Sequence, residues 1–366
     1  DDGAVDLLRQ QGHRPRLWVA HHQDIRAHGV QGHGSIDQGL ALFDGRSLDR
    51  HVDDVAAQAL AAVGLPAGDA AHIAQCLVDV DLRGVRTHGT RQLRRYVNEF
   101  RDGQVNTTPC SRLLRETDNS LRFDGDGGAG YLVATRATDA ACERAQTTGI
   151  VLASTCNHGH VGSAGIYGRR ALAHGLISWC VAGATTWSRP DEPGTTIWDA
   201  MKAPPMCFAV PAAEGGPPLV LDMNANQFGT AASAEAAIAA GFGKSVFGSL
   251  GMRFVSTLLG GMLSGNSDEQ APPRSYTGAT RGFFLVVIDP ALVGDADAFR
   301  AEVRRVIDAS LSLQPMAGTD VAAVPGTLEW RRESAWAAAG IPISDDHQER
   351  LETIAMELGL DLPAWH

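Results

Sequence analysis

Two histidines, each surrounded by glycines and small polar residues, are the residues of this sequence best suited to chemistry. His88 lies in the segment Thr-His-Gly, and His160 lies in Gly-His-Val-Gly. A glycine beside a polar side chain lets backbone or a ligand approach closely, because glycine has no Cβ. An imidazole with a pKa near 6.5 can give or accept a proton close to neutral pH. The two segments together predict a pocket for proton transfer, whereas either histidine taken alone is better explained as a structural residue near a turn.

A metal site is the alternative use of such histidines. His158 is two residues from His160, and side chains at that spacing on a strand point to one face, as zinc ligands do. No third ligand accompanies them, so we expect no metal there. The N-terminal stretch is also rich in histidine, including His21, His22, His28 and His33, but it has no recurring ligand spacing and no cysteine.

Composition limits the class of protein. With 366 residues, 44% hydrophobic and 20% charged, the chain resembles an ordinary soluble globular protein with more than one structural lobe. The net charge of −11 argues against a nucleic-acid partner. The sequence has no uninterrupted run of 18 apolar residues, so a membrane span is not expected. It does not open with a charged segment followed by an apolar one, so a secretion signal is not expected either. Six scattered cysteines without a Cys-x-x-Cys motif predict free thiols and a cytoplasmic location.

The spacing of apolar residues predicts a mixed α/β protein. Helices are expected over residues 47–63, 69–81, 93–103, 131–146, 163–174, 252–263, 298–312 and 345–358. Strands are expected over residues 121–124, 150–154, 176–182, 208–211, 219–223 and 282–288. Nothing matches a Gly-x-Gly-x-x-Gly turn between a strand and a helix, so a Rossmann cofactor site is not predicted. A P-loop is rejected because Ile238 stands where that motif needs glycine.

Six motifs, in the right order over about residues 47–330, resemble those of the type 2 malate/L-lactate dehydrogenase family. This family also includes ureidoglycolate dehydrogenase, diketogulonate reductase and cyclic-imine reductases. The departures described below would make this chain a divergent member. The motifs are Asp81-Leu82-Arg83-Gly84, Thr87-His88-Gly89, Gly103-Gln104-Val105-Asn106, Phe123-Asp124-Gly125-Asp126-Gly127-Gly128-Ala129-Gly130, Asn157-His158-Gly159-His160-Val161-Gly162 and Leu221-Asp222-Met223.

The resemblance implies a non-Rossmann fold with a largely antiparallel, cofactor-type sheet domain and a helical domain. The expected organisation has four parts. Residues 1–46 form an extension, and residues 47–118 form the helical domain that carries Thr-His-Gly. Residues 119–292 form the sheet-containing domain for cofactor and substrate. Residues 293–366 form a C-terminal helical segment that packs on the N-terminal domain.

The resemblance also implies roles for site residues. His88 is expected to be the proton donor, and His160 is expected to lie in the substrate pocket with Thr87 and His158 nearby. The position of the family's carboxylate-binding arginine is Gln92, and glutamine cannot replace a guanidinium charge. Either Arg91 or Arg95 takes over that role, or the substrate lacks the carboxylate.

The cofactor implied by the resemblance is NAD or NADP. Its expected contacts are the strand residues Asp222, Met223 and Asn224 and the loop residues Gly278, Ala279 and Thr280. Two other cofactor segments depart from the family pattern: Lys202-Ala203-Pro204-Pro205 replaces Gly-Thr-Asn-Pro, and Gly248-Ser249-Leu250-Gly251 replaces Lys-Gly-Tyr-Gly. The stretch that follows Asp222 is also shorter than in the family. These departures predict weakened but real nicotinamide binding.

Three hypotheses for function follow. The first is an NAD(P)H-dependent oxidoreductase that reduces a 2-oxo acid, cyclic imine or related carbonyl in a specialised biosynthetic pathway. The second is a cofactor-independent proton-transfer enzyme, such as an isomerase, dehydratase or cyclase, that uses the same histidine pocket. The third is a non-catalytic binding subunit. The expected partners are a small-molecule substrate and a second copy of the chain, since family members pair as homodimers.

Overall fold

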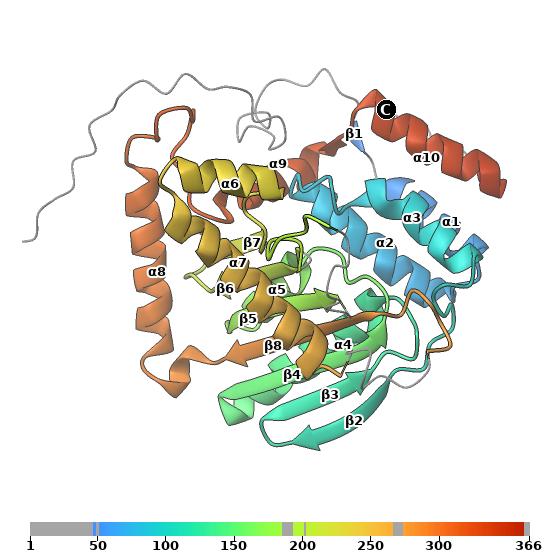
Figure 1. Ribbon diagram of the computed structural model, residues 1–366, viewed down its shortest axis with the longest axis horizontal. Coiled ribbons are helices and arrows are strands. Elements are labelled where there is room, and N and C mark those ends of the chain that lie inside the picture. Colours follow the sequence, from blue (N-terminus) through green and yellow to red (C-terminus); the bar gives the residue numbers. More distant parts are fainter. Residues whose placement is uncertain (1–46, 49–50, 185–192, 201–202, 266–273, 362–366) are drawn as a thin grey trace, which may run out of the picture. The chain divides into compact units, whose positions relative to one another are not determined.

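The computed structural model describes residues 47–361 apart from 49–50, 185–192, 201–202 and 266–273 (Figure 1). The described residues all belong to one unit of the chain, Ala41–His366. The predicted extension 1–46, with its histidines, lies outside the described residues.

Three helices carry the first histidine motif. α1 (His51–Ala62) packs against α2 (Ala67–Leu82), with the Gly64-Leu65-Pro66 turn between them. Apolar residues at helical spacing, such as Leu60 and Leu77, are fully buried where the helices meet. Past α2 the chain runs through the Thr-His-Gly segment into a 3₁₀ turn, Thr90–Gln92, and then into α3 (Leu93–Arg101).

A seven-stranded mixed sheet forms the other major layer, in the order β2-β3-β4-β8-β5-β6-β7 (Figure 1). Among these seven strands only β3 and β4 pair in parallel, and every other pair is antiparallel. The predicted α/β fold with a largely antiparallel sheet is therefore confirmed. The strands are β2 (Arg112–Thr117), β3 (Ser120–Asp124), β4 (Ile150–His158), β5 (Ile177–Ala184), β6 (Pro205–Val210), β7 (Leu219–Asn224) and β8 (Arg281–Ile288).

All six predicted strands are present in this sheet, and β2 is the one strand of the sheet that the sequence did not predict. Its six residues are all exposed, so it has no alternation of buried and exposed positions to detect. β2 falls within the range predicted to be helical, and its pairing with β3 places it in the sheet. β4 also runs four residues beyond its predicted end, to His158, which brings the sheet directly to the second histidine.

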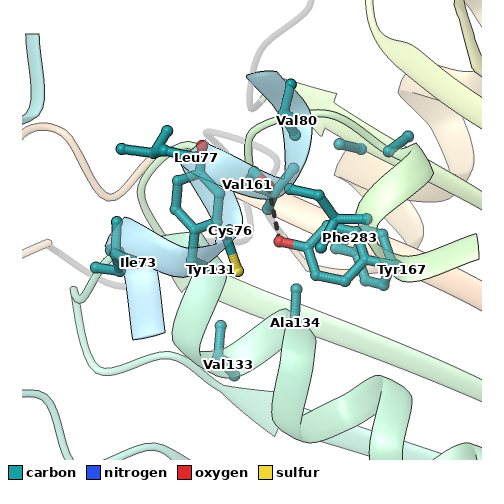
Figure 2. Close-up of a cluster of buried hydrophobic side chains, with 14 of the residues drawn as sticks. Ile73, Cys76, Leu77, Val80, Tyr131, Val133, Ala134, Val161, Tyr167 and Phe283 are labelled. Atoms are coloured by element: carbon teal, nitrogen blue, oxygen red, sulfur yellow. Dashed lines mark hydrogen bonds between the residues drawn. The ribbon is translucent and has the colours of Figure 1, made fainter. Parts of the chain in front are cut away.

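Two helices pack on the sheet beside the central strands. α4 (Gly130–Thr148) lies on β4, and α5 (Gly165–Leu172) lies on β5 and β6. Figure 2 shows that α2, α4, α5 and β8 meet in one apolar cluster that includes Leu77, Tyr131, Tyr167 and Phe283. The hydroxyl of Tyr167 donates a 2.7 Å hydrogen bond to the carbonyl of Val161, as drawn in Figure 2. The core thus joins the helices to the sheet next to the second histidine loop.

The remaining elements surround this core. The apolar helix predicted over 252–263 begins earlier, as α7 (Gly243–Thr257), and continues as a π-helical turn, Leu258–Leu263. α6 (Ala231–Ala239) and α9 (Thr327–Ala339) were not predicted, because each buries a single residue and so shows no apolar stripe. α8 (Ala296–Leu311) and α10 (Asp345–Leu358) form as predicted. Strand β1 (Ser47–Leu48) pairs with β9 (Ile341–Pro342), so the helix predicted from residue 47 was wrong at its start, and α1 begins at His51. α10 contacts α1 and α3.

Candidate active site

One cavity of about 530 Å³ holds both histidines that were predicted to be catalytic. Its walls come from the loop after α2, the loop between β4 and α5, strand β7 and the first residue of β8. The ring centroids of His88 and His160 lie 6.2 Å apart, with an angle of 22° between the ring planes. The other polar side chains of the wall are Thr87, Ser163, Arg169, Asp222, Asn224, Arg281 and Glu329.

The loop that carries His88 is fastened to a buried carboxylate. Asp81, near the end of α2, accepts hydrogen bonds from the backbone N–H and the hydroxyl of Thr90, at 2.8 and 2.5 Å. Thr90 Oγ1 also lies 2.9 Å from Nε2 of His347 on α10. Burial raises the pKa of Asp81 to about 6, although the two hydrogen bonds from Thr90 lower it. The loop is therefore held between α2 and the C-terminal helix.

This attachment predicts that Gly89→Ala damages the site through Asp81. A Cβ at position 89 would overlap the Asp81 carboxylate, although φ of −88° suits any residue. Overpacking of this kind typically costs about 1–3 kcal/mol, so we expect a lower free energy of unfolding and a loss of turnover as the His88 loop shifts. Chemical denaturation of the variant and the parent measures the first effect.

Gly68→Ala is the matched control. Gly68 is exposed on α2, the helix that carries Asp81, and a Cβ at position 68 would meet nothing within 4 Å. Its substitution should be neutral or add up to about 1 kcal/mol of stability, because alanine is the better helix former. Equal stabilities for the Gly89→Ala variant and the parent would show that the loop is not held against Asp81.

His160 is positioned by the end of β4 and by α3. Asn157 has φ of 55°, a left-handed conformation that asparagine tolerates, and the register with β8 shifts just before His158. These features turn the chain out of the sheet toward the cavity. Tyr96 of α3 places its hydroxyl 2.8 Å from Nδ1 of His160 and 3.0 Å from the hydroxyl of Tyr131.

These contacts define which ring nitrogen of His160 carries the proton. The backbone N–H of Gly162 donates to Nδ1 at 3.2 Å, so Nδ1 must be an acceptor. A neutral His160 therefore has its proton on Nε2, and Tyr96 donates to Nδ1 while it accepts from Tyr131. Burial, together with nearby arginines, lowers the pKa of His160 well below its usual value. His160 is a neutral imidazole whose Nε2–H remains available as a hydrogen-bond donor.

His88 is set up differently. Its Nδ1 lies 3.0 Å from the hydroxyl of Thr87, which leaves Nε2 for a ligand. Burial lowers the pKa of His88, while the negative charge of Asp222 opposes that shift. Among the described residues, no contact of His88 fixes which of its ring nitrogens carries the proton. His88 is therefore better suited than His160 to gain and lose a proton.

The far wall of the cavity is built around Asp222 of β7. Its carboxylate accepts a hydrogen bond from the hydroxyl of Ser163 and another from the backbone N–H of Gly165. The positive charge of Arg169 acts on Asp222 as well, yet burial raises the pKa of this carboxyl above its usual value. The predicted cofactor residues Asp222, Met223 and Asn224 therefore line the cavity together with the two histidines.

Other predicted site residues lie outside this cavity. His158 is fully buried, with Nε2 2.7 Å from the Thr155 hydroxyl and Nδ1 2.8 Å from the carbonyl of Gly159. Arg91 is exposed and forms an ion pair with Asp346 on α10 at 3.1 Å. Gln92 donates from Nε2 to the backbone carbonyl of Thr87 at 2.8 Å, so it supports the His88 loop from outside the cavity.

The loop Gly278–Thr280 is also apart from the cavity walls. The backbone N–H of Gly278 donates to the carbonyl of Gln104 at 2.8 Å, and Ala279 is buried. A Cβ at position 278 would lie 2.9 Å from that same carbonyl oxygen, so close packing alone accounts for this glycine. Its predicted role in cofactor binding remains a prediction.

Sequence reasoning missed five polar residues of the site: Tyr96, Ser163, Arg169, Arg281 and Glu329. Arg281 gave a usable signal, because it is a charged residue at the very start of the most apolar strand. Tyr96 lies on the apolar stripe of α3 with Leu93, Val97 and Phe100, which indicates an inward side chain but not its contact with His160. Arg169 and Glu329 lie on helices whose sequence does not distinguish an inward side chain from an exposed one. No group of three or more potential metal ligands occurs among the described residues.

Comparison with known proteins agrees with this architecture. The family model for malate/L-lactate dehydrogenase matches residues 49–241 and 230–352. The chain belongs to the malate/L-lactate dehydrogenase family. It is therefore a dehydrogenase, and the resemblance read from its motifs is confirmed.

The relatives of this dehydrogenase are distant but span most of its length. A malate dehydrogenase of Pyrococcus horikoshii is 28% identical over 338 residues, covering 82% of this chain and 92% of the relative. An L-lactate dehydrogenase of Cupriavidus necator is 27% identical over 356 residues, covering 88% and 99%. A solved structure of the P. horikoshii malate dehydrogenase superimposes with a TM-score of 0.73 at 25% identity, covering 87% of this chain and 97% of that one. The low identities fit a divergent member of the family.

Proposed function

We propose that this dehydrogenase uses NAD(H) or NADP(H) to interconvert a 2-oxo acid, cyclic imine or related carbonyl compound with its reduced form. The observation that carries this proposal is the cavity in which His88 and His160 face Asp222, Met223 and Asn224. Names of the relatives support the cofactor: one is a ureidoglycolate dehydrogenase for NAD⁺, and another is a (2R)-3-sulfolactate dehydrogenase for NADP⁺. Membership of the family favours this function over cofactor-independent proton transfer.

The residues of the cavity fit a nicotinamide group. A nicotinamide ring needs an apolar surface, and Pro204, Pro205, Val220 and Met223 supply one in the wall of the cavity. Its carboxamide needs polar partners, which Asn224 and Asp222 can provide. When bound, the nicotinamide supplies or accepts the hydride. The segment that departs from the family pattern, Ala203 to Pro205, lies in this wall, which supports the expectation of weakened binding.

The two histidines have different roles in the reaction. Nε2–H of His160 donates a hydrogen bond to the substrate's carbonyl or imine and so fixes its orientation. His88 gives the proton to the developing alkoxide or amine during reduction, and takes it back during oxidation. The fixed neutral state of His160 keeps the two rings from competing for one proton.

Cofactor binding tests this proposal. We expect NADH or NADPH to raise the melting temperature, since a ligand at a hundred times its dissociation constant adds about 2.7 kcal/mol of stability. Calorimetry with each dinucleotide gives the dissociation constants and the preferred cofactor. No heat and no shift in melting temperature at millimolar concentrations of both would refute the proposed function.

The pH dependence follows from the lowered pKa of His88. Oxidation needs neutral His88 as the base, so kcat/KM for oxidation should rise with pH and level off, with its midpoint below 6.5. Reduction needs protonated His88, so kcat/KM for reduction should fall as pH rises through the same midpoint. Steady-state rates from pH 5 to 9 in both directions measure the two profiles. A midpoint above 7 would contradict the assignment of His88 as a buried acid–base group.

We also propose that the protein is a homodimer in the cytoplasm. Helix Gly243–Leu263 is long and apolar enough to cross a membrane, yet 44% of its apolar 18-residue window is buried in the protein. Apolar side chains are exposed along it, namely Phe247 (66%), Leu258 (45%) and Leu263 (60%). Such an apolar face is typical of an interface between protein chains. All six cysteines are free, which supports a reducing compartment.

Sedimentation at micromolar concentration should give about twice the monomer mass of 38.7 kDa. Leu258→Asp on the exposed face should shift that mass toward the monomer, because it buries a charge in the interface. The exposed Arg305→Gln variant on α8 is the control that should leave the mass unchanged. A monomer mass for the parent protein would exclude the dimer.

A further inference from the structure

Arg281 is a cation fixed in the wall of the active-site cavity. It begins β8, where its backbone pairs with His158 of β4 on one side and with Ala184 of β5 on the other. Its side chain lines the same cavity as His88 and His160. A residue held between two strands in the middle of the sheet is a rigid support for a binding group.

The charge of Arg281 is left without a close partner among the described residues. In the part of the chain that the structure describes, its side chain makes no hydrogen bond and no carboxylate lies within ion-pairing distance of it. Glu99 is the acidic group whose charge acts on Arg281, but its Oε1 is bonded by Arg95 Nε at 2.7 Å. The other cavity arginine, Arg169, is balanced by Asp222 and Glu329.

A partly buried guanidinium without a partner favours an anionic ligand. Burial lowers the pKa of Arg281, yet a guanidinium keeps its charge at any physiological pH. Of the two histidines, His160 is neutral because burial lowers its pKa well below the usual value, and His88 is charged only while it holds its catalytic proton, so Arg281 is the permanent cation beside them. The planar fork of a guanidinium matches the two oxygens of a carboxylate.

We propose that Arg281 binds the carboxylate of the substrate and makes this enzyme selective for 2-oxo and 2-hydroxy acids. In such a substrate the carboxylate is attached directly to the carbon that His88 and His160 serve, so one molecule can meet all three side chains. The inference rests on the proposed function and narrows its substrate class. The family's carboxylate-binding arginine is replaced by Gln92 in this chain, and none of Gln92, Arg91 and Arg95 lines the cavity. Arg281 would therefore take over the binding of the carboxylate.

Oxalate binding tests the anion site without turnover. Calorimetry should show that the parent enzyme binds oxalate, and that Arg281→Gln weakens binding by about 10- to 100-fold, as expected for a lost charge-assisted hydrogen bond. Arg281→Lys should lie between the two, because lysine keeps the charge but not the fork. Arg305→Gln, an exposed arginine on α8, is the control. If Arg281→Gln does not fold, the comparison of Arg281→Lys with the parent decides.

Selectivity between an acid and its ester tests the role in catalysis. The parent should prefer pyruvate, or whichever 2-oxo acid it reduces fastest, over the methyl ester of that acid by kcat/KM. Arg281→Gln should lose at least tenfold of this preference, through the KM of the acid, while the ester is affected little. A merely structural role for Arg281 would slow acid and ester alike.

The outcomes separate the two proposals. Absence of oxalate binding by the parent, equal binding by all Arg281 variants, or an unchanged acid-to-ester ratio would overturn the role of Arg281. Those results would leave the dehydrogenase function standing if NADH or NADPH still supports turnover. Conversely, oxalate binding that depends on Arg281 in a protein that binds neither dinucleotide would support the anion site and overturn the proposed function.

Discussion

His88→Ala is expected to lower turnover by about 10²- to 10⁴-fold, the usual cost of removing a positioned general acid. The loss should appear in kcat with both the oxidised and the reduced substrate, because one side chain serves both directions. Stability should change little, since the only side-chain hydrogen bond of His88 among the described residues joins it to the neighbouring Thr87 hydroxyl. Steady-state kinetics and thermal unfolding of the purified variant measure the two effects.

His174→Ala is the control for this experiment. His174 is exposed after α5, with Nδ1 3.0 Å from the side-chain amide of Gln146, and it lies outside the cavity. Its removal should leave turnover unchanged. Activity of His88→Ala within a few-fold of the parent would mean that His88 is structural and that the proton comes from another group.

His160→Ala should have the second largest effect, about 10²- to 10³-fold in kcat, as for loss of one preorganised donor to a developing oxyanion. The expected loss is smaller than the upper range for His88, because His160 does not transfer the proton. His160→Gln should recover part of the rate, since a glutamine amide can place an N–H near the position of Nε2. Both variants should bind the nicotinamide dinucleotide as the parent does.

The pH profile distinguishes the two histidines. In His160→Ala the midpoint attributed to His88 should persist, whereas in His88→Ala it should disappear. If His160→Ala abolishes the midpoint and His88→Ala keeps it, the assignments of acid and donor are reversed. A rate within threefold for His160→Ala would remove His160 from the reacting centre altogether.

The sequence predicted much of the fold because its signals were local. The alternation and apolar runs of β3 to β8 and the helical spacing of α2, α4 and α10 are all properties of short segments. β2 failed this test because all of its residues are exposed. α6 failed because only Ala234 of its nine residues is buried. Both elements exist because neighbouring segments support them.

The candidate site was predicted in part for the same reason. His88 and His160 stood out by their glycine-rich surroundings, and β7 stood out by its motif. The tautomer of His160 depends on Tyr96, which comes from α3, and no pattern in the sequence joins the two. The fate of Arg91 depends on Asp346 of α10, far along the chain. Such pairings between distant segments require the folded structure.

The most direct test of the central claim is the loss of NADH or NADPH absorbance in the near ultraviolet when the parent enzyme meets a panel of 2-oxo acids. We expect at least one acid to be reduced at a rate proportional to enzyme concentration, with one dinucleotide preferred. We also expect His88→Ala to abolish most of that rate under the same conditions. Binding of a dinucleotide with no oxidation by any 2-oxo acid or cyclic imine, or turnover that does not depend on His88, would contradict the account.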